Sequence, residues 1–144
     1  MPMSRWLITW NPKTYSGPIV NWKVSRYLDE LRTGDDVVLW QSGAMAGVAG
    51  VYRVTACPVE TPDGDPDKGW ASPGDARRVE HILPLAEVLR LPDPIPKAVL
   101  RKDRRFADAM VLRAPFQANP FRLTEEQWAA VRERLPSADV LSRH

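Results

Sequence analysis

Near its N-terminus the chain reads Trp6-Leu7-Ile8-Thr9-Trp10-Asn11-Pro12. The first five of these residues are apolar, aromatic or β-branched, which favours a strand, and the Asn-Pro pair is a loop signal that ends it. Because side chains alternate along a strand, Trp6 and Trp10 share one face. We expect Trp6 in the core and Trp10 at the strand end, where a cavity rim can form.

Further elements follow along the chain. Val24, Tyr27, Leu28 and Leu31 recur at helical spacing, and this pattern predicts a helix that stops at Gly34. The β-rich runs 37–42 and 47–55 are separated by Gly43-Ala44-Met45-Ala46, which predicts a hairpin, and 77–85 is another candidate strand.

The C-terminal third shows one clear helix. Thr124-Glu125-Glu126-Gln127 has the form of a capping box, and Trp128, Val131 and Leu135 then follow on one stripe. Trp128 is therefore expected in the core. Short strands with helices outside their hairpins indicate an α+β fold, with a small, strongly bent sheet or barrel.

Composition bounds the class of protein. A chain of 144 residues with 44% hydrophobic content can bury one good core, so we expect one globular domain. The single cysteine, Cys57, excludes an internal disulfide, and the sequence has no pattern of a signal peptide and no apolar run of about 20 residues. We expect a soluble, cytoplasmic protein.

Although the net charge is only +2, the segment 97–113 is strongly basic. Its cations can contact phosphates, and a solvated basic helix face is the alternative. The residues that we expect to contact a nucleic-acid backbone are Lys97, Arg101, Lys102, Arg104 and Arg105.

Several of the six tryptophans lie where core burial does not readily explain them. Trp22 is off the apolar stripe of the predicted helix, Trp70 lies in a loop of Pro, Gly and Asp, and Trp40 follows three core-like residues on a strand. Indoles placed this way suggest a pocket that stacks on a flat ligand. The alternatives are packing under a loop for Trp22, a loop anchor for Trp70, and sheet core for Trp40.

Signals for catalysis, metals and cofactors are poor. The two histidines, His81 and His144, supply no ligand cluster or nucleophile system, and Ser42 lacks the G-x-S-x-G elbow. The sequence has no glycine-rich phosphate-binding motif either. We therefore expect no catalytic residue, no metal and no cofactor.

Four stretches together resemble an EVE domain, in the order and spacing of that family. They are 6–12, Leu31-Arg32-Thr33-Gly34-Asp35-Asp36-Val37-Val38-Leu39-Trp40, Gly47-Val48-Ala49-Gly50-Val51-Tyr52-Arg53-Val54, and 119–128. The resemblance implies a domain over 4–135 followed by a tail, 136–144. The implied fold is PUA-like, a strongly bent β-barrel of about five to six strands with flanking helices, in the superfamily of YTH and ASCH domains.

The resemblance also implies a binding site. Thr9, Trp10 and Asn11 correspond to the stretch that hydrogen-bonds the base edge in the YTH relatives. Trp22 falls where those relatives place a cage tryptophan, and Trp70 lies in the loop that supplies the second one. The remaining residues expected at the pocket rim are Gln41, Ser42, Arg113 and Asn119, and from the residues alone Trp40 is a further candidate wall.

From these observations we expect a non-catalytic module that recognises a modified nucleobase, in DNA or RNA, through an aromatic pocket. Restriction or RNA-related proteins are the partners that the family resemblance suggests. An enzyme acting on a nucleobase or nucleotide, as in ASCH relatives, and a protein-interaction module are the alternatives.

Overall fold

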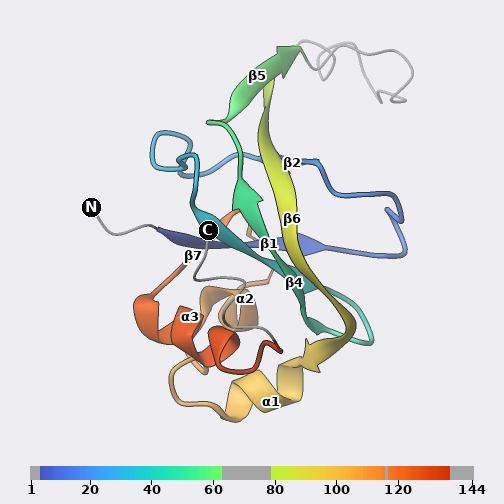
Figure 1. Ribbon diagram of the computed structural model, residues 1–144, viewed down its shortest axis with the longest axis vertical. Coiled ribbons are helices and arrows are strands. Elements are labelled where there is room, and N and C mark those ends of the chain that lie inside the picture. The colour runs from blue at the N-terminus through green and yellow to red at the C-terminus, as the bar shows by residue number, and fades with distance from the viewer. Residues whose placement is uncertain (1–3, 63–78, 116, 137–144) are drawn as a thin grey trace.

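The computed structural model describes residues 4–62, 79–115 and 117–136, and in this part the strands form one mixed sheet (Figure 1). The sheet order is β2-β6-β4-β3-β1-β7, and β5 pairs with β6 beside this path. The strands are β1 (Arg5–Trp10), β2 (Asn21–Val24), β3 (Asp36–Gln41), β4 (Gly47–Val54), β5 (Val59–Pro62), β6 (Val79–Pro96) and β7 (Phe121–Leu123).

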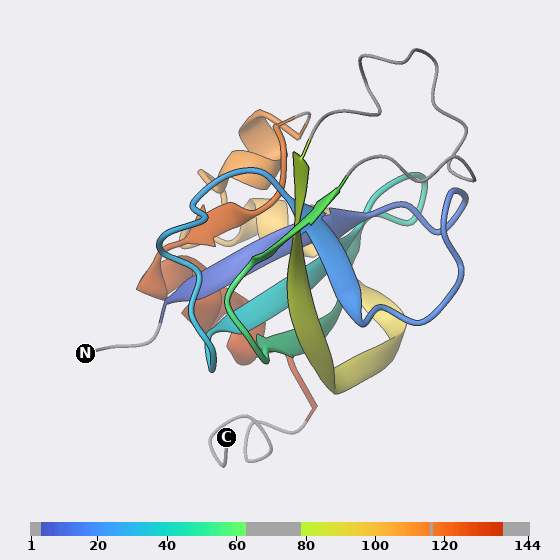
Figure 2. The same cartoon turned by 90° about the horizontal axis from the view of Figure 1, so that it is seen from above.

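The sheet is strongly curled, so its two edges approach one another. β1 and β3 are parallel and the other pairs are antiparallel. Viewed from above, the strands wrap around an interior (Figure 2). The Ser25 backbone N–H, directly after β2, donates to the carbonyl of Asn119, just before β7, at 2.9 Å. The expected α+β fold with a strongly bent barrel-like sheet is confirmed; the sheet is a curled half-barrel, with seven strands in the described part where about five to six were expected.

Both faces of the central strands are buried, because side chains alternate between two cores. Trp6, Ile8 and Trp10 point into the barrel interior, whereas Leu7 points to the opposite face. The helices α1 (Lys97–Lys102), α2 (Met110–Arg113) and α3 (Glu125–Arg132) lie together on one side of the sheet in Figure 1. They cover this opposite face.

The C-terminal helix begins as predicted. The Thr124 hydroxyl accepts from the Gln127 backbone N–H at 3.1 Å, and the Gln127 side chain accepts from the Thr124 backbone N–H at 2.9 Å. Both bonds satisfy amides that the first turn leaves open. Trp128 is buried, so its predicted core position is confirmed.

The predicted helix over Val24–Leu31 is wrong. Val24 ends β2 and points into the barrel core, and the residues after it form turns. Tyr27 has φ of 56°, a left-handed conformation that a regular helix excludes. Val24 is buried from the strand, Leu31 is buried from a turn, and Tyr27 and Leu28 are partly buried between them. Their spacing resembles that of a helical face although no helix forms.

In the part of the chain that the structure describes, no helix is long and apolar enough to cross a membrane.

Candidate nucleobase pocket

A cavity of about 440 Å³ lies at the end of β1, between β2 and the segment that precedes β7. Six residues expected at the binding site line it together: Thr9, Trp10, Asn11, Trp22, Ser42 and Asn119. They come from four separate stretches of the chain, and the curl of the sheet brings them to one place. Aromatic side chains together with a few convergent polar groups are features of small-molecule sites, and this lining has both.

Three hydrogen bonds fix the wall formed by Trp22 and Asn119. The indole Nε1 of Trp22 donates to the carbonyl of Thr9 at 3.1 Å. The Oδ1 atom of Asn119 accepts from the backbone N–H of Thr9 at 2.8 Å, and the Asn119 Nδ2 donates to the Thr9 carbonyl at 3.4 Å. The backbone groups of Thr9 are thus occupied within the protein. Thr9 contributes its position rather than open hydrogen-bonding groups.

Trp22 is the aromatic surface of the pocket. Its side chain is half-buried, and the Tyr15 ring packs against it edge-on, with the ring centroids 5.7 Å apart and the planes at 66°. Trp22 lies on β2 and not before a helix, so its orientation follows from the strand and from the hydrogen bond to Thr9. An indole held in this way can stack on a planar ligand.

Trp10 forms a more deeply buried wall, with only 7% of the residue exposed. Its Nε1 donates to the Tyr15 carbonyl at 2.7 Å, and the Arg90 guanidinium lies 4.7 Å from the centre of its ring. Arg90 also donates to the Tyr52 hydroxyl at 3.1 Å. Burial raises the pKa of Tyr52 above its ordinary value, so the phenol that accepts from Arg90 is neutral.

Ser42 closes the pocket where β3 ends. Its backbone N–H and its hydroxyl both donate to the carbonyl of Trp10, at 2.8 and 3.1 Å. These bonds continue the parallel pairing of β1 with β3 by one residue beyond the strands. The rim at Ser42 is therefore fixed relative to the end of β1.

Asn11 supplies an open donor at the mouth of the pocket. It is exposed, and its Oδ1 accepts from the backbone N–H of Lys13 at 2.9 Å. Among the residues that the structure describes, the Asn11 Nδ2 donates no hydrogen bond. A side-chain amide has two donor hydrogens, and here both can turn toward a ligand.

The other lining residues were not anticipated from the sequence. They are Thr14, Lys23, Val24, Ser25 and Ala118. Three of them follow Trp22 directly, so recognising 21–24 as a strand would have indicated them. Within the described part, the lining contains no carboxylate and no imidazole, and no cluster of three or more His, Cys, Asp or Glu side chains could hold a metal ion.

Three of the expected site residues lie away from this cavity. Trp40 is only 4% exposed and stacks on Phe106 in the core beneath the helices, with ring centroids 6.0 Å apart. Gln41 donates from Nε2 to the carbonyl of Met45 across the β3–β4 turn at 3.3 Å. Arg113 is exposed at the end of α2. The expected second cage residue, Trp70, lies outside the described residues.

The expected backbone-contacting cations do not form one uniform surface. Lys97 and Arg101 line a second cavity beside the β3–β4 turn. Lys102 and Arg104 are exposed outside it. Arg105 instead donates to both carboxylate oxygens of Asp103, at 3.1 and 2.9 Å, and to Glu133 at 2.9 and 2.7 Å. The Arg105 guanidinium is thus occupied within the protein.

Comparison with known proteins gives a family and a fold. The EVE domain family model matches residues 4–134, and no curated protein matches the sequence. A hypothetical protein from Leishmania major superposes with a TM-score of 0.66 at 16% identity, over 92% of this chain and 94% of its own.

Two further solved structures are informative. Human THYN1 protein, in complex with DNA containing 5-methylcytosine, is 16% identical with a TM-score of 0.55, over 89% of this chain and 95% of that one. An ASCH protein from Zymomonas mobilis is 15% identical with a TM-score of 0.57, over 90% and 94% of the two chains. At these identities the likeness establishes the PUA-like fold, as the sequence predicted.

Proposed function

This chain belongs to the EVE domain family, and from that premise we propose that it is a non-catalytic reader domain. It binds a modified nucleobase of DNA or RNA in the cavity at the end of β1. The observation that carries the proposal is the pairing, in one pocket, of the half-buried indole of Trp22 with the open amide donor of Asn11.

The energetics of base binding support this site. Taking a base out of its stack costs a few kcal/mol, and stacking on an aromatic side chain returns about 1–3 kcal/mol. The Asn11 amide can add hydrogen bonds to the polar edge of the base. A methyl group on the base then adds buried apolar area, for a selectivity of about 1–3 kcal/mol.

The fold neighbour from human supports the ligand class. That protein was solved with DNA containing 5-methylcytosine. Its match to this chain extends over nearly the whole domain, so a modified base is a reasonable ligand to test first. For the chain studied here, base identity and the choice between DNA and RNA belong to the proposal.

Binding without chemistry is the second element of the proposal. General acid–base catalysis needs a positioned group that can exchange a proton near neutral pH. The lining offers hydroxyls, amides, indoles and Lys23, and the Lys23 ammonium pairs with the Glu80 carboxylate. Such groups orient a ligand but do not provide an acid–base pair. Incubation with modified nucleosides should therefore leave them unchanged by mass spectrometry.

Labelled oligonucleotides provide the direct test. Fluorescence anisotropy is measured with DNA and RNA strands that carry 5-methylcytosine, N6-methyladenine or only unmodified bases. Asn11→Ala should weaken binding of the modified strand by about 1 kcal/mol or more, because the substitution removes the open donor. Lys13→Ala is the matched control, since the Asn11 side chain accepts its hydrogen bond from the Lys13 backbone, which this variant keeps. Equal affinity for all strands, or protein-dependent turnover, contradicts the proposal.

A further inference from the structure

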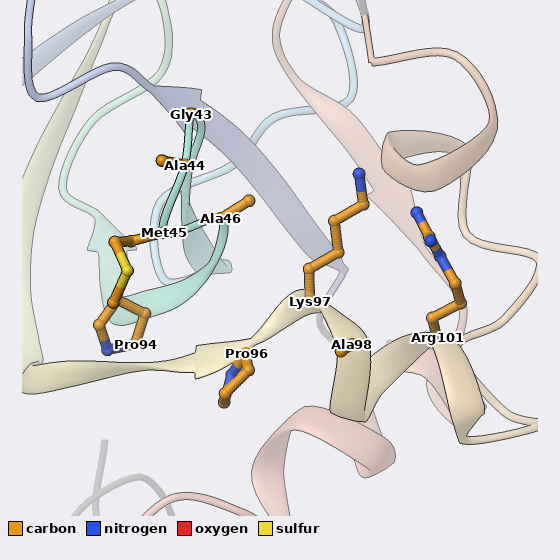
Figure 3. Close-up of a pocket in the computed structure, with 9 residues that line it drawn as sticks. All are labelled: Gly43, Ala44, Met45, Ala46, Pro94, Pro96, Lys97, Ala98 and Arg101. Atoms are coloured by element: carbon orange, nitrogen blue, oxygen red, sulfur yellow. The ribbon is translucent and has the colours of Figure 1, made fainter.

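A second cavity, also of about 440 Å³, lies between the β3–β4 turn and α1 (Figure 3). Its lining is mainly apolar and includes Gly43, Met45, Pro94 and Ala98. Two cations, Lys97 and Arg101, complete it. The cavity therefore combines an apolar surface with concentrated positive charge.

The two cations are held side by side. Lys97 and Arg101 are four residues apart on α1, so they occupy the same face of the helix. Figure 3 shows both side chains extending to the same side of α1. Within the described residues neither cation forms an ion pair, in contrast to Arg105, which is bound by two carboxylates. Their charge is available to a ligand.

Hydrogen bonds fix the turn that faces them. The Lys97 backbone N–H donates to the carbonyl of Ala46 at 2.9 Å, which joins α1 to the turn. Gln41 donates to the carbonyl of Met45 at 3.3 Å. Met45 is nevertheless 68% exposed, a large apolar side chain presented to solvent. A thioether in that position makes favourable contacts with an aromatic ring.

This cavity adjoins the candidate nucleobase pocket. Ser42 lines the pocket and Gly43, the next residue, lines the second cavity. Consecutive Cα atoms are about 3.8 Å apart, so the two cavities meet at the start of the β3–β4 turn, and a nucleotide next to a base bound in the pocket can reach the second cavity.

We propose that the second cavity is a subsite for the nucleotide next to the bound base. Lys97 and Arg101 contact its phosphate, and Met45 and Pro94 contact the base or sugar. The inference rests on the proposed function and adds to it a second contact region. Phosphate contacts fix register without reading sequence, so this subsite adds affinity for a strand and leaves base selectivity to the pocket.

The test compares a modified nucleoside with a trinucleotide that carries the same base in the middle. The variant Lys97→Ala/Arg101→Ala should bind the nucleoside as the wild type does. It should bind the trinucleotide about tenfold more weakly, and the salt dependence of log K should flatten by about 0.7 units of slope, the value for one phosphate contact. The double variant Lys102→Ala/Arg104→Ala is the matched control, because it removes two cations outside the cavity.

Met45→Ala is a second variant that leaves the charges in place, and it should also lower trinucleotide affinity while sparing the nucleoside. Equal losses in the two double variants overturn the subsite, as does competition by an acidic peptide at the same strength as the trinucleotide. Unchanged trinucleotide affinity in Lys97→Ala/Arg101→Ala, with nucleoside binding intact, overturns the subsite alone. Absence of any nucleoside or trinucleotide binding by the wild type overturns the proposed function as well.

Discussion

The Oδ1 atom of Asn119 accepts two hydrogen bonds from Thr9, one from the backbone N–H at 2.8 Å and one from the hydroxyl at 3.1 Å. The two residues are 110 positions apart in the sequence. A side-chain amide thus takes the place of a neighbouring strand at the end of β1. It satisfies backbone groups that the curled sheet leaves open, and it forms part of the pocket wall at the same time.

Replacing Asn119 with Ala should affect both stability and binding. The substitution leaves the part-buried Thr9 N–H without its acceptor, which costs about 1–3 kcal/mol. Urea denaturation measures the loss, and anisotropy measures binding. Asn21→Ala is the control, because Asn21 is an exposed residue of the same type on β2. Equal stability of the two variants would contradict the assigned role of the Asn119 amide.

Two substitutions of Trp22 should distinguish its stacking on a base from its hydrogen bond to Thr9. Trp22→Phe keeps an aromatic ring but loses the bond from Nε1 to the Thr9 carbonyl, so stability should fall by about 1 kcal/mol while most binding remains. Trp22→Ala should weaken binding of a modified base by about 1–3 kcal/mol. Because the residue is half-buried, the melting temperature also falls in Trp22→Ala. A circular dichroism spectrum that stays native shows that the binding loss comes from the pocket.

Trp40 tests the distinction between core and pocket. It stacks on Phe106 in the core under the helices and does not line the cavity. Trp40→Ala should therefore destabilise the fold by about 3–5 kcal/mol. At a temperature where the variant is still folded, preference for a modified over an unmodified base should be unchanged. If a folded Trp40→Ala variant loses its preference for the modified base, Trp40 is part of the binding site.

Gly50 should tolerate no side chain. A Cβ built on it lies 2.5 Å from the carbonyl oxygen of Leu89 on the neighbouring β6, a backbone atom that cannot rotate away. Gly50→Ala should force the strands apart and cost about 1–3 kcal/mol in denaturant unfolding. Gly43→Ala is the comparison, since its Cβ meets nothing within 4 Å and only the backbone, at φ of +102°, is strained.

The cluster around Arg105 should make stability depend on pH in the acidic range. Hydrogen bonds from Arg105 hold the pKa values of Asp103 and Glu133 below their ordinary values. Carboxyl groups with lowered pKa values stabilise the fold above their unfolded pKa, about 4, and this contribution is lost as the pH falls further. Arg105→Ala should lower the melting temperature at neutral pH, and the difference from wild type should shrink in acid. Arg104→Ala, which removes an exposed cation, should show no such convergence.

The same variant bears on nucleic-acid binding. Arg105 was expected among the phosphate contacts, but its guanidinium is engaged with two carboxylates. Arg105→Ala should therefore leave the salt dependence of oligonucleotide binding unchanged, in contrast to the loss of Lys97 and Arg101. A flatter salt dependence in Arg105→Ala would show that Arg105 also contacts phosphate.

Local sequence patterns predicted the elements in which each residue type agrees with its final environment. The runs that became β1, β3 and β4, the turn between them, and the capping box of α3 are of this kind. Prediction failed between 24 and 34, where Tyr27 adopts a left-handed conformation. Helical spacing of apolar residues does not distinguish a helix from a series of turns that buries the same residues.

The length of β6 was also not predictable. The candidate strand 77–85 stops well short of the observed end, in a segment where prolines follow and each proline removes a ladder hydrogen bond. In the structure β6 continues to Pro96. Its pairing with β4 shifts register between Arg90 and Ile95, so Pro92 and Pro94 fall where the ladder is interrupted. That accommodation depends on the partner strand and cannot be read from β6 itself.

For the pocket, the family pattern located residues that local periodicity could not bring together. Six of the expected residues share one cavity because the sheet curls, which is a property of all its strands. Trp40 was ambiguous for the opposite reason. Both faces of β3 are buried, so alternation places Trp40 on one face without indicating whether that face meets a core or a ligand.

The wide separation of Thr9 and Asn119 also orders events during translation. Synthesis adds about 5–20 residues per second, so Asn119 is made roughly 5–20 s after Thr9. Until then the end of β1 lacks the amide that fixes it, and one wall of the cavity does not exist. A chain that ends before Asn119 therefore lacks one wall of the candidate pocket, and we expect it to bind a ligand there more weakly than the full-length chain.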